Sequence, residues 1–138
     1  MVTTKALAAY RLEKAVGCLA ASRVAIEADD YFTAANRSYY AIFHAIRSVL
    51  ALRQVDFSNH GQVIGYFRRE FIKTAIFPKE MSYIIDTLFD TRNKSDYDDF
   101  FLISKEEVTE QHISAENFIS EIQVYLEKQG LAMGGSGF

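Results

Sequence analysis

Residues that break helices are scarce in this chain, and their scarcity restricts the fold more than any other feature. Pro78 is the only proline, and only three of the seven glycines precede residue 130. Apolar residues recur at the 3.6-residue spacing of amphipathic helices, whereas strand-like alternation is rare and the Asn-Gly signal of a hairpin is missing. We therefore expect an all-α protein.

Five helical segments are expected from the apolar spacing and from residues that start helices. Ser58 or Asn59 can cap the third segment, and Ser104 followed by Glu107 forms a capping-box pattern before the last one. Four long helices and a shorter one, joined by short loops, favour an antiparallel up-and-down bundle. The expected helices cover residues 3–27, 31–53, 60–74, 79–94 and 105–128.

The chain has the size of a single domain, with 138 residues of which 49% are hydrophobic. This is enough apolar material for a packed core. We assign residues 1–129 to the helical bundle. Residues 130–138, GLAMGGSGF, lack helical periodicity and are expected to form a flexible C-terminal tail.

The cellular location follows from what the sequence lacks. A single cysteine, Cys18, cannot form an internal disulfide, which favours a reducing compartment. No stretch approaches the ~18 apolar residues of a membrane span, and charges come too early in the N-terminal segment for a secretory signal. We expect a cytoplasmic protein that does not enter a membrane.

Net charge argues against a broad surface for duplex nucleic acid. The chain carries a formal charge of −3 and has a pI of about 5.6. Basic residues nevertheless gather in the middle of the sequence, whereas most charged residues after Asp96 are acidic. A local basic cleft is compatible with this distribution.

The second expected helix has two distinct faces. Its apolar arc predicts a core face, and a separate polar arc could bind phosphate and stack on a base. The alternative is an ordinary polar edge of the bundle. No second ligand stands one turn from His44, so no metal site is expected there. The core arc contains Tyr39, Phe43, Ile46 and Leu50, and the polar arc contains Arg37, Tyr40, His44 and Arg47.

In the fourth expected helix, Arg92 continues the apolar stripe of Ile85 and Leu88. A guanidinium that points inward needs a carboxylate, a partner chain or a ligand, because an unpaired buried charge is costly. Two structural alternatives stay open. Arg92 could extend to solvent from the helix end, or it could pair with an aspartate among residues 96–99.

The segment from Asp30 to Tyr97 resembles the HEPN family of small prokaryotic helical domains. The carrying stretches are NRSYYAIFHA, SNHGQVIGYFRREFIKT, PKE and RNKSDYDDF. The resemblance implies a helical bundle that dimerises and is often encoded beside a minimal nucleotidyltransferase as a toxin–antitoxin pair. It further implies a metal-independent ribonuclease without a cofactor, whose site lies in a cleft between two copies.

The catalytic motif of that family is an arginine, a polar residue, three variable residues and a histidine. Arg92 and Asn93 match the first two positions, and Tyr97 stands in place of the histidine. A tyrosine hydroxyl keeps its proton at neutral pH, so it makes a poor base. It can still donate a hydrogen bond, stack on a base, or accept a nucleotidyl group from a transferase.

The resemblance leads to two hypotheses about function. The first is an RNA-directed, toxin-like protein with Arg92, Asn93, Asp96 and Tyr97 at its centre and the polar arc as RNA- or nucleotide-binding walls. The second is a non-catalytic interaction or nucleotide-binding module that docks to, or is modified by, a nucleotidyltransferase. Among other histidines that could replace the missing base, His44 is the preferred candidate. His60 begins the third helix, and His112 lies on an apolar stripe and is expected to pack.

Overall fold

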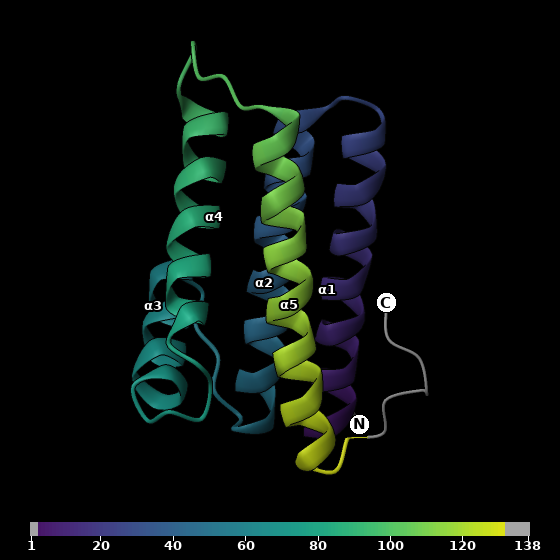
Figure 1. Ribbon diagram of the computed structural model, residues 1–138. Coiled ribbons are helices and arrows are strands. Elements are labelled where there is room, and N and C mark those ends of the chain that lie inside the picture. The colour runs from purple at the N-terminus through teal and green to yellow at the C-terminus, as the bar shows by residue number, and fades with distance from the viewer. Residues whose placement is uncertain (1–2, 132–138) are drawn as a thin grey trace.

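A computed structural model describes residues 3–131 of the protein and confirms the all-α prediction (Figure 1). Four long helices and one short helix are present, and no strand occurs in the described range. A short π-helical turn continues the short helix. The elements are α1 (Thr4–Glu27), α2 (Tyr31–Leu52), α3 (His60–Phe67), η1 (Arg68–Ile72), α4 (Glu80–Tyr97) and α5 (Lys105–Lys128).

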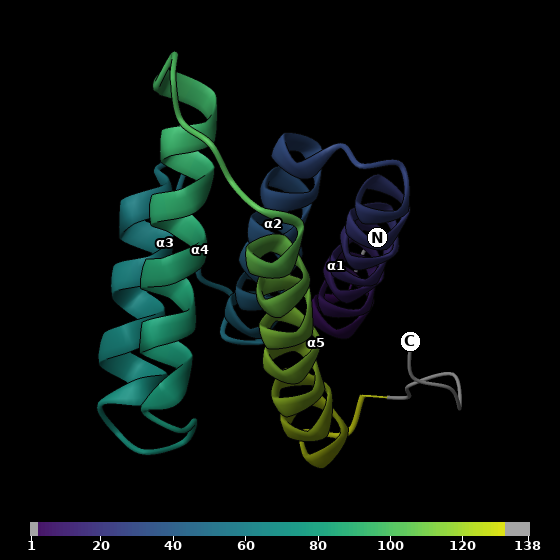
Figure 2. The same cartoon turned by 45° about the horizontal axis from the view of Figure 1, so that its top comes forward.

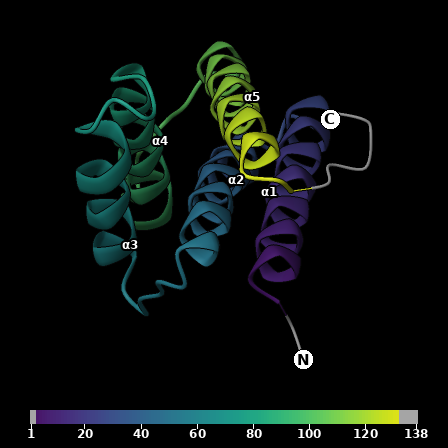
Figure 3. The ribbon, with the colours of Figure 1, turned by 90° about the horizontal axis from the view of Figure 1, so that it is seen from below.

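Helix α2 is the centre of the bundle and contacts α1, α3, α4 and α5. Consecutive long helices run up and down, with α5 packed against both α1 and α2 (Figure 1). Helices α3 and α4 stand together as a pair beside the group formed by α1, α2 and α5 (Figures 2 and 3). The polar arc of α2 therefore has α1, α3 and α4 as neighbours from which further side chains can reach it.

Helix boundaries agree with most of the start signals. The Asn59 side chain accepts a hydrogen bond from the Gln62 backbone N–H at 3.2 Å and so caps α3. Ser104 and Glu107 form the expected capping box of α5. Two boundaries differ from the prediction: the segment expected as one helix over 60–74 splits into α3 and η1, and α4 continues to Tyr97 instead of ending at 94.

The core face predicted for α2 is confirmed. Tyr39 and Leu50 are at most 1% exposed, and Phe43 is 5% exposed. A second set of buried aromatic residues joins α3 and η1 to α5 through ring contacts of 5.4–6.0 Å. This aromatic cluster holds the short helix in place against the long ones. Its members are Phe67, Phe71, Phe77 and Phe118.

At the C-terminus, packing continues past the predicted boundary at residue 129. Gly130 has a φ of 89°, a left-handed conformation that glycine adopts readily after a helix. The Leu131 backbone N–H then donates to the Leu126 carbonyl at 3.0 Å, and the Leu131 side chain is buried. The rest of the predicted tail lies outside the described residues.

Two kinds of feature do not occur in the described range. None of the helices between residues 3 and 131 combines the length and apolar character needed to cross a membrane. Over the same range, no three histidine, cysteine or acidic side chains gather as candidate metal ligands.

Candidate functional site

Arg92 lies on α4 with its side chain 17% exposed, which confirms the predicted inward orientation. Its Nη2 donates a hydrogen bond to the Tyr40 hydroxyl at 3.0 Å. Its Nε lies 3.0 Å from Asp96 Oδ2, so pairing with an aspartate also occurs. Nε makes no hydrogen bond to that oxygen, and the contact is an ion pair. Within residues 3–131, Nη1 has no hydrogen-bond partner and remains a donor for a ligand.

Tyr40 lies close to two guanidinium groups. The Cζ atoms of Arg37 and Arg92 are 5.3 and 5.4 Å from the centre of its ring, within the range of a cation–π contact. Arg37 donates to Asn36 Oδ1 and to Cys18 Sγ. Arg37 forms no ion pair with any carboxylate in the described part of the chain. Its charge is therefore free to attract an anion.

Further cations surround the same face of α2. Arg11 and Arg47 share one carboxylate, since Asp56 Oδ2 lies 3.2 Å from Arg11 and Asp56 Oδ1 lies 3.3 Å from Arg47. Lys14 lies near enough to His44 to lower its pKa. Together with Arg37 and Arg92, these groups form a basic cluster. Among residues 3–131, Asp56 and Asp96 are the only carboxylates paired with its arginines. Such an excess of positive charge favours a phosphate-bearing ligand.

His60, the first residue of α3, packs against the tyrosines of α2. Its Nδ1 lies 3.2 Å from the Tyr39 hydroxyl, and its ring stacks on Phe43 at 4.1 Å. The ring centres of His60 and Tyr40 are 5.9 Å apart. Burial, followed by the positive charge of Arg92, lowers the pKa of His60. Sequence reasoning gave His60 no role, because only the loop between α2 and α3 decides which side chains it meets.

The predicted site residues separate into two groups. Arg92 and Asp96 meet Tyr40, and through it Arg37, within one cluster. Asn93 is exposed on α4. Tyr97 is 72% exposed, and its hydroxyl makes no hydrogen bond between residues 3 and 131. The residues that sequence reasoning missed are Lys14, Arg11, Tyr39, Asp56 and His60.

His44 lies among the cations of the basic cluster, and Arg92 is not one of the charges that lower its pKa. Its Nδ1 is buried without a hydrogen-bond partner among the residues that the structure covers. Burial is the main cause that lowers its pKa to about 4, and nearby cations lower it further. A histidine held neutral in this way resists protonation. The cations are Lys14, Arg47, Arg37 and Arg11.

This environment of His44 predicts that acid destabilises the fold. Because the folded pKa is about 4 and the unfolded value is about 6.5, the unfolded state binds more protons below pH 6.5. The free energy of unfolding therefore keeps its full value above pH 6.5 with respect to His44, and it decreases as pH falls toward 4. At pH 5 the loss from His44 is about 2 kcal/mol. Urea titrations at pH 7 and pH 5 should show a smaller pH effect for His44→Gln than for the unmodified protein. Equal losses in both proteins would contradict this assignment.

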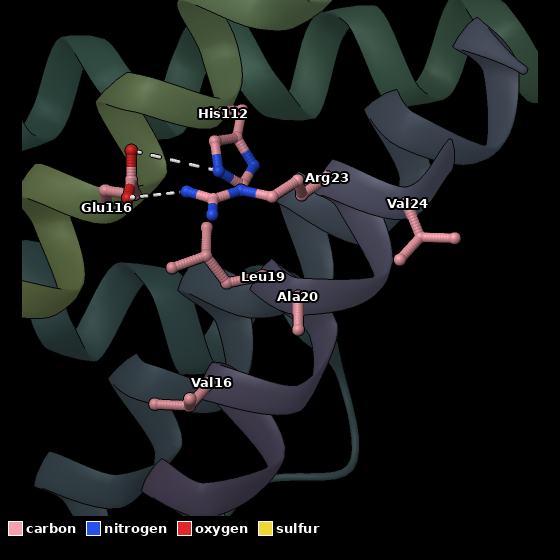
Figure 4. Close-up of a pocket in the computed structure, with 7 residues that line it drawn as sticks. All are labelled: Val16, Leu19, Ala20, Arg23, Val24, His112 and Glu116. Carbon is pink, nitrogen blue, oxygen red and sulfur yellow. Dashed lines mark ion pairs between the residues drawn. The ribbon is translucent and has the colours of Figure 1, made fainter. Parts of the chain in front are cut away.

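A separate cavity of about 320 Å³ opens between α1 and α5 (Figure 4). Val16, Leu19 and Val24 make its wall largely apolar, and Glu116 lies 3.8 Å from both Arg23 and His112. His112 is 7% exposed and contacts the Ser22 hydroxyl through Nδ1, so its predicted packing role is confirmed. None of the basic-cluster residues lines this cavity.

Comparison with known proteins extends over nearly the whole bundle. The family model described as HEPN domain matches residues 8–125. A UPF0332 protein of Thermotoga maritima is 30% identical over 118 residues, which cover 86% of this chain and 89% of that protein.

Two proteins of Methanocaldococcus jannaschii are also similar. One, named "Putative toxin MJ0142", is 28% identical over 123 residues, covering 89% of this chain and 84% of the relative. The other, named "Putative toxin MJ0605", is 27% identical over 110 residues, covering 80% and 76%.

Proposed function

The chain belongs to the HEPN domain family, and on that premise we propose that it is an RNA-directed, toxin-like protein. Its site is the basic cluster around Tyr40 and Arg92, and a homodimer forms a cleft there. Its antitoxin is a minimal nucleotidyltransferase, and the pair acts in the cytoplasm. The names of the two archaeal relatives support the toxin-like part of this proposal.

The observation that carries the proposal is the pair of guanidinium groups beside the ring of Tyr40. Arg37 lacks a carboxylate partner in the described range, and Arg92 retains a free Nη1 donor. Single-stranded nucleic acid offers both ligands that this geometry suits, since phosphates bind arginine and bases stack on aromatic rings. Duplex DNA fits poorly, because the chain as a whole is acidic.

Each side chain has a distinct task in this proposal. Arg37 and Arg92 bind phosphate groups, and in a ribonuclease Arg92 stabilises the extra negative charge of the transition state. Asp96 fixes the orientation of the Arg92 side chain through its ion pair. Tyr40 fixes the opposite end of that guanidinium and offers its ring to a base.

The direct test is binding of a fluorescent, mixed-sequence single-stranded RNA to the purified protein. We expect an affinity that weakens as salt increases, with duplex DNA binding more weakly at every salt concentration. Sedimentation of the same sample tests whether the protein forms a dimer. Co-expression and co-purification with a minimal nucleotidyltransferase test whether the two proteins bind each other. Absence of RNA binding at low salt would contradict the RNA-directed function.

A second candidate function is supported by the exposed end of α4. Tyr97 is 72% exposed, and Phe100 and Leu102 that follow it are 95% and 86% exposed. Adjacent exposed apolar residues are typical of a docking surface. In this alternative the protein is a non-catalytic module, and a nucleotidyltransferase docks at Tyr97 and transfers a nucleoside monophosphate to its hydroxyl, releasing pyrophosphate.

The alternative predicts a specific effect of Tyr97→Phe. The change should abolish the mass increase of the peptide containing residue 97 after incubation with the transferase and ATP. It should alter the free energy of unfolding by less than about 0.5 kcal/mol, since the side chain is exposed. Tyr83→Phe is the matched control, because Tyr83 is 61% exposed on the same helix. An adduct that persists in Tyr97→Phe would exclude this acceptor.

A further inference from the structure

We propose that His60 is the proton-accepting base of the Arg92 site and takes the part for which position 97 offers only a tyrosine. This inference rests on the proposed RNA-directed function and adds to it a residue from α3. Its basis is that His60 and Arg92 lie close together although they belong to different helices. Spacing along the sequence does not predict this proximity.

The two residues contact the same pair of tyrosine rings. The Cζ atom of Arg92 lies 5.5 Å from the ring centre of Tyr39 and 5.4 Å from that of Tyr40. The ring of His60 lies 6.1 Å from Tyr39 and 5.9 Å from Tyr40. A phosphate bound by Arg92 is therefore within reach of an imidazole, and a ribose attached to that phosphate can approach the same ring.

The Tyr39 hydroxyl fixes the imidazole. His60 Nδ1 lies 3.2 Å from this hydroxyl, and Phe43 stacks against the ring. Burial raises the pKa of Tyr39 to about 12, so its hydroxyl remains protonated and can still accept a hydrogen bond. When Nδ1–H donates to Tyr39, the lone pair of the imidazole is on Nε2. Nε2 has no hydrogen-bond partner in the described chain and keeps contact with solvent.

Burial and the surrounding charges lower the pKa of His60 and so favour its neutral form. Burial lowers its pKa first, followed by the positive charges of Arg92 from α4 and Arg47 from α2. Tyr39 and Tyr40 are the other titratable groups that contact the ring. A neutral imidazole can accept a proton directly.

The other two histidines fit this task less well. The pKa of His44 is lowered to about 4, so it is a weaker base, and its Nδ1 is buried. The ring centre of His44 lies 6.1 Å from that of Tyr40, and Arg92 is not among the charges that act on His44. His112 lies at the cavity between α1 and α5, away from the cluster.

The proposed reaction is an attack of a ribose 2′-oxygen on the adjacent phosphorus. His60 Nε2 accepts the proton of a ribose 2′-hydroxyl while the 2′-oxygen forms a bond to the adjacent phosphorus. Arg92 stabilises the negative charge on the phosphoryl oxygens as the bond from phosphorus to the 5′-oxygen breaks. Water protonates the departing 5′-oxygen, and the resulting hydroxide takes the proton from His60. The products are a 2′,3′-cyclic phosphate and a 5′-hydroxyl.

The test uses the full chain and a labelled, mixed-sequence single-stranded RNA, with binding and cleavage measured separately. His60→Ala should lower the cleavage rate about 100-fold or more, while its RNA affinity changes less than about threefold. Added imidazole should restore cleavage in His60→Ala. His60→Gln retains a side chain that can bond to Tyr39 but cannot accept the proton, so it should be as slow. The cleavage rate of the unmodified protein should increase with pH through the lowered pKa of His60.

His112→Gln is the matched control, because it removes a histidine with a lowered pKa outside the cluster and should leave cleavage within about threefold. Wild-type cleavage in His60→Ala would overturn the inference. So would an equal loss of binding and cleavage without rescue by imidazole, since His60 would then only hold the phosphate. RNA binding without cleavage by the unmodified protein would overturn this inference and leave the proposed function intact. Absence of binding would overturn both.

Discussion

Replacing Arg92 by alanine should weaken RNA binding about 10- to 100-fold and abolish any cleavage of the bound RNA. The magnitude follows from the loss of a charge-assisted hydrogen bond to phosphate, which is worth about 1.5–3 kcal/mol. The RNA affinity of Arg92→Lys should lie between those of the unmodified protein and Arg92→Ala, because lysine keeps the charge but lacks the planar fork. Fluorescence anisotropy over a range of salt concentrations measures this effect. The slope of log K against log salt should decrease by about 0.7 in Arg92→Ala, as expected for one lost contact to a single strand.

Arg68→Ala is the matched control for this change. Arg68 belongs to η1 and pairs with Asp86 at 2.6 Å, so its removal deletes the same charge outside the basic cluster. It should leave RNA affinity within about threefold. If both variants lose affinity equally, the effect is one of net charge, and the assignment of Arg92 to a binding site is wrong. Circular dichroism should show the same helical content in both proteins.

Phe67→Ala should be the most destabilising of the changes considered, at about 3–5 kcal/mol. Phe67 is completely buried in α3, and its ring lies 5.4 Å from Phe77 and 6.0 Å from Phe118. Alanine leaves a cavity among rings that hold the short helix against α5. Thermal unfolding should show a decrease in Tm of about 10–20 °C.

Two further variants test the cause of that destabilisation. Phe67→Leu keeps most of the volume and should cost about 1.5 kcal/mol or less. Phe100→Ala removes a ring that is 95% exposed and should change stability by less than about 0.5 kcal/mol. If Phe67→Ala unfolds at the wild-type temperature, the aromatic cluster does not anchor α3. His60 would then have a different source of rigidity.

Much of the fold could be predicted because it depends on local rules. The 3.6-residue apolar spacing placed the long helices within a few residues, and Asn59 and Ser104 marked two helix starts through their side-chain oxygens. The inward orientation of Arg92 followed from its place on an apolar stripe. The π-helical turn at Arg68–Ile72 was missed, because one extra residue per turn leaves no mark in a short apolar pattern. The end of α4 was placed too early, because neither glycine nor proline stops the helix before Tyr97.

The candidate site was predicted in part, for a different physical reason. Arg37, Tyr40, His44 and Arg47 share a face of one helix, so helical spacing alone grouped them. The bond between Arg92 and Tyr40 joins residues 52 positions apart. The contact between His60 and Tyr39 spans 21 positions and a loop. Neither follows from periodicity along a single helix.

By itself, the sequence determined an all-helical bundle, the buried face of α2 and an arginine directed into the structure. It also carried the resemblance to the HEPN family, through residues spread over most of the domain. The tertiary structure alone decided which polar side chains meet: Arg92 with Tyr40, Arg11 with Asp56, and His60 with Tyr39. The reason is physical. Spacing along a helix sets which face a side chain occupies, but loop lengths and the packing of whole helices set what lies opposite that face.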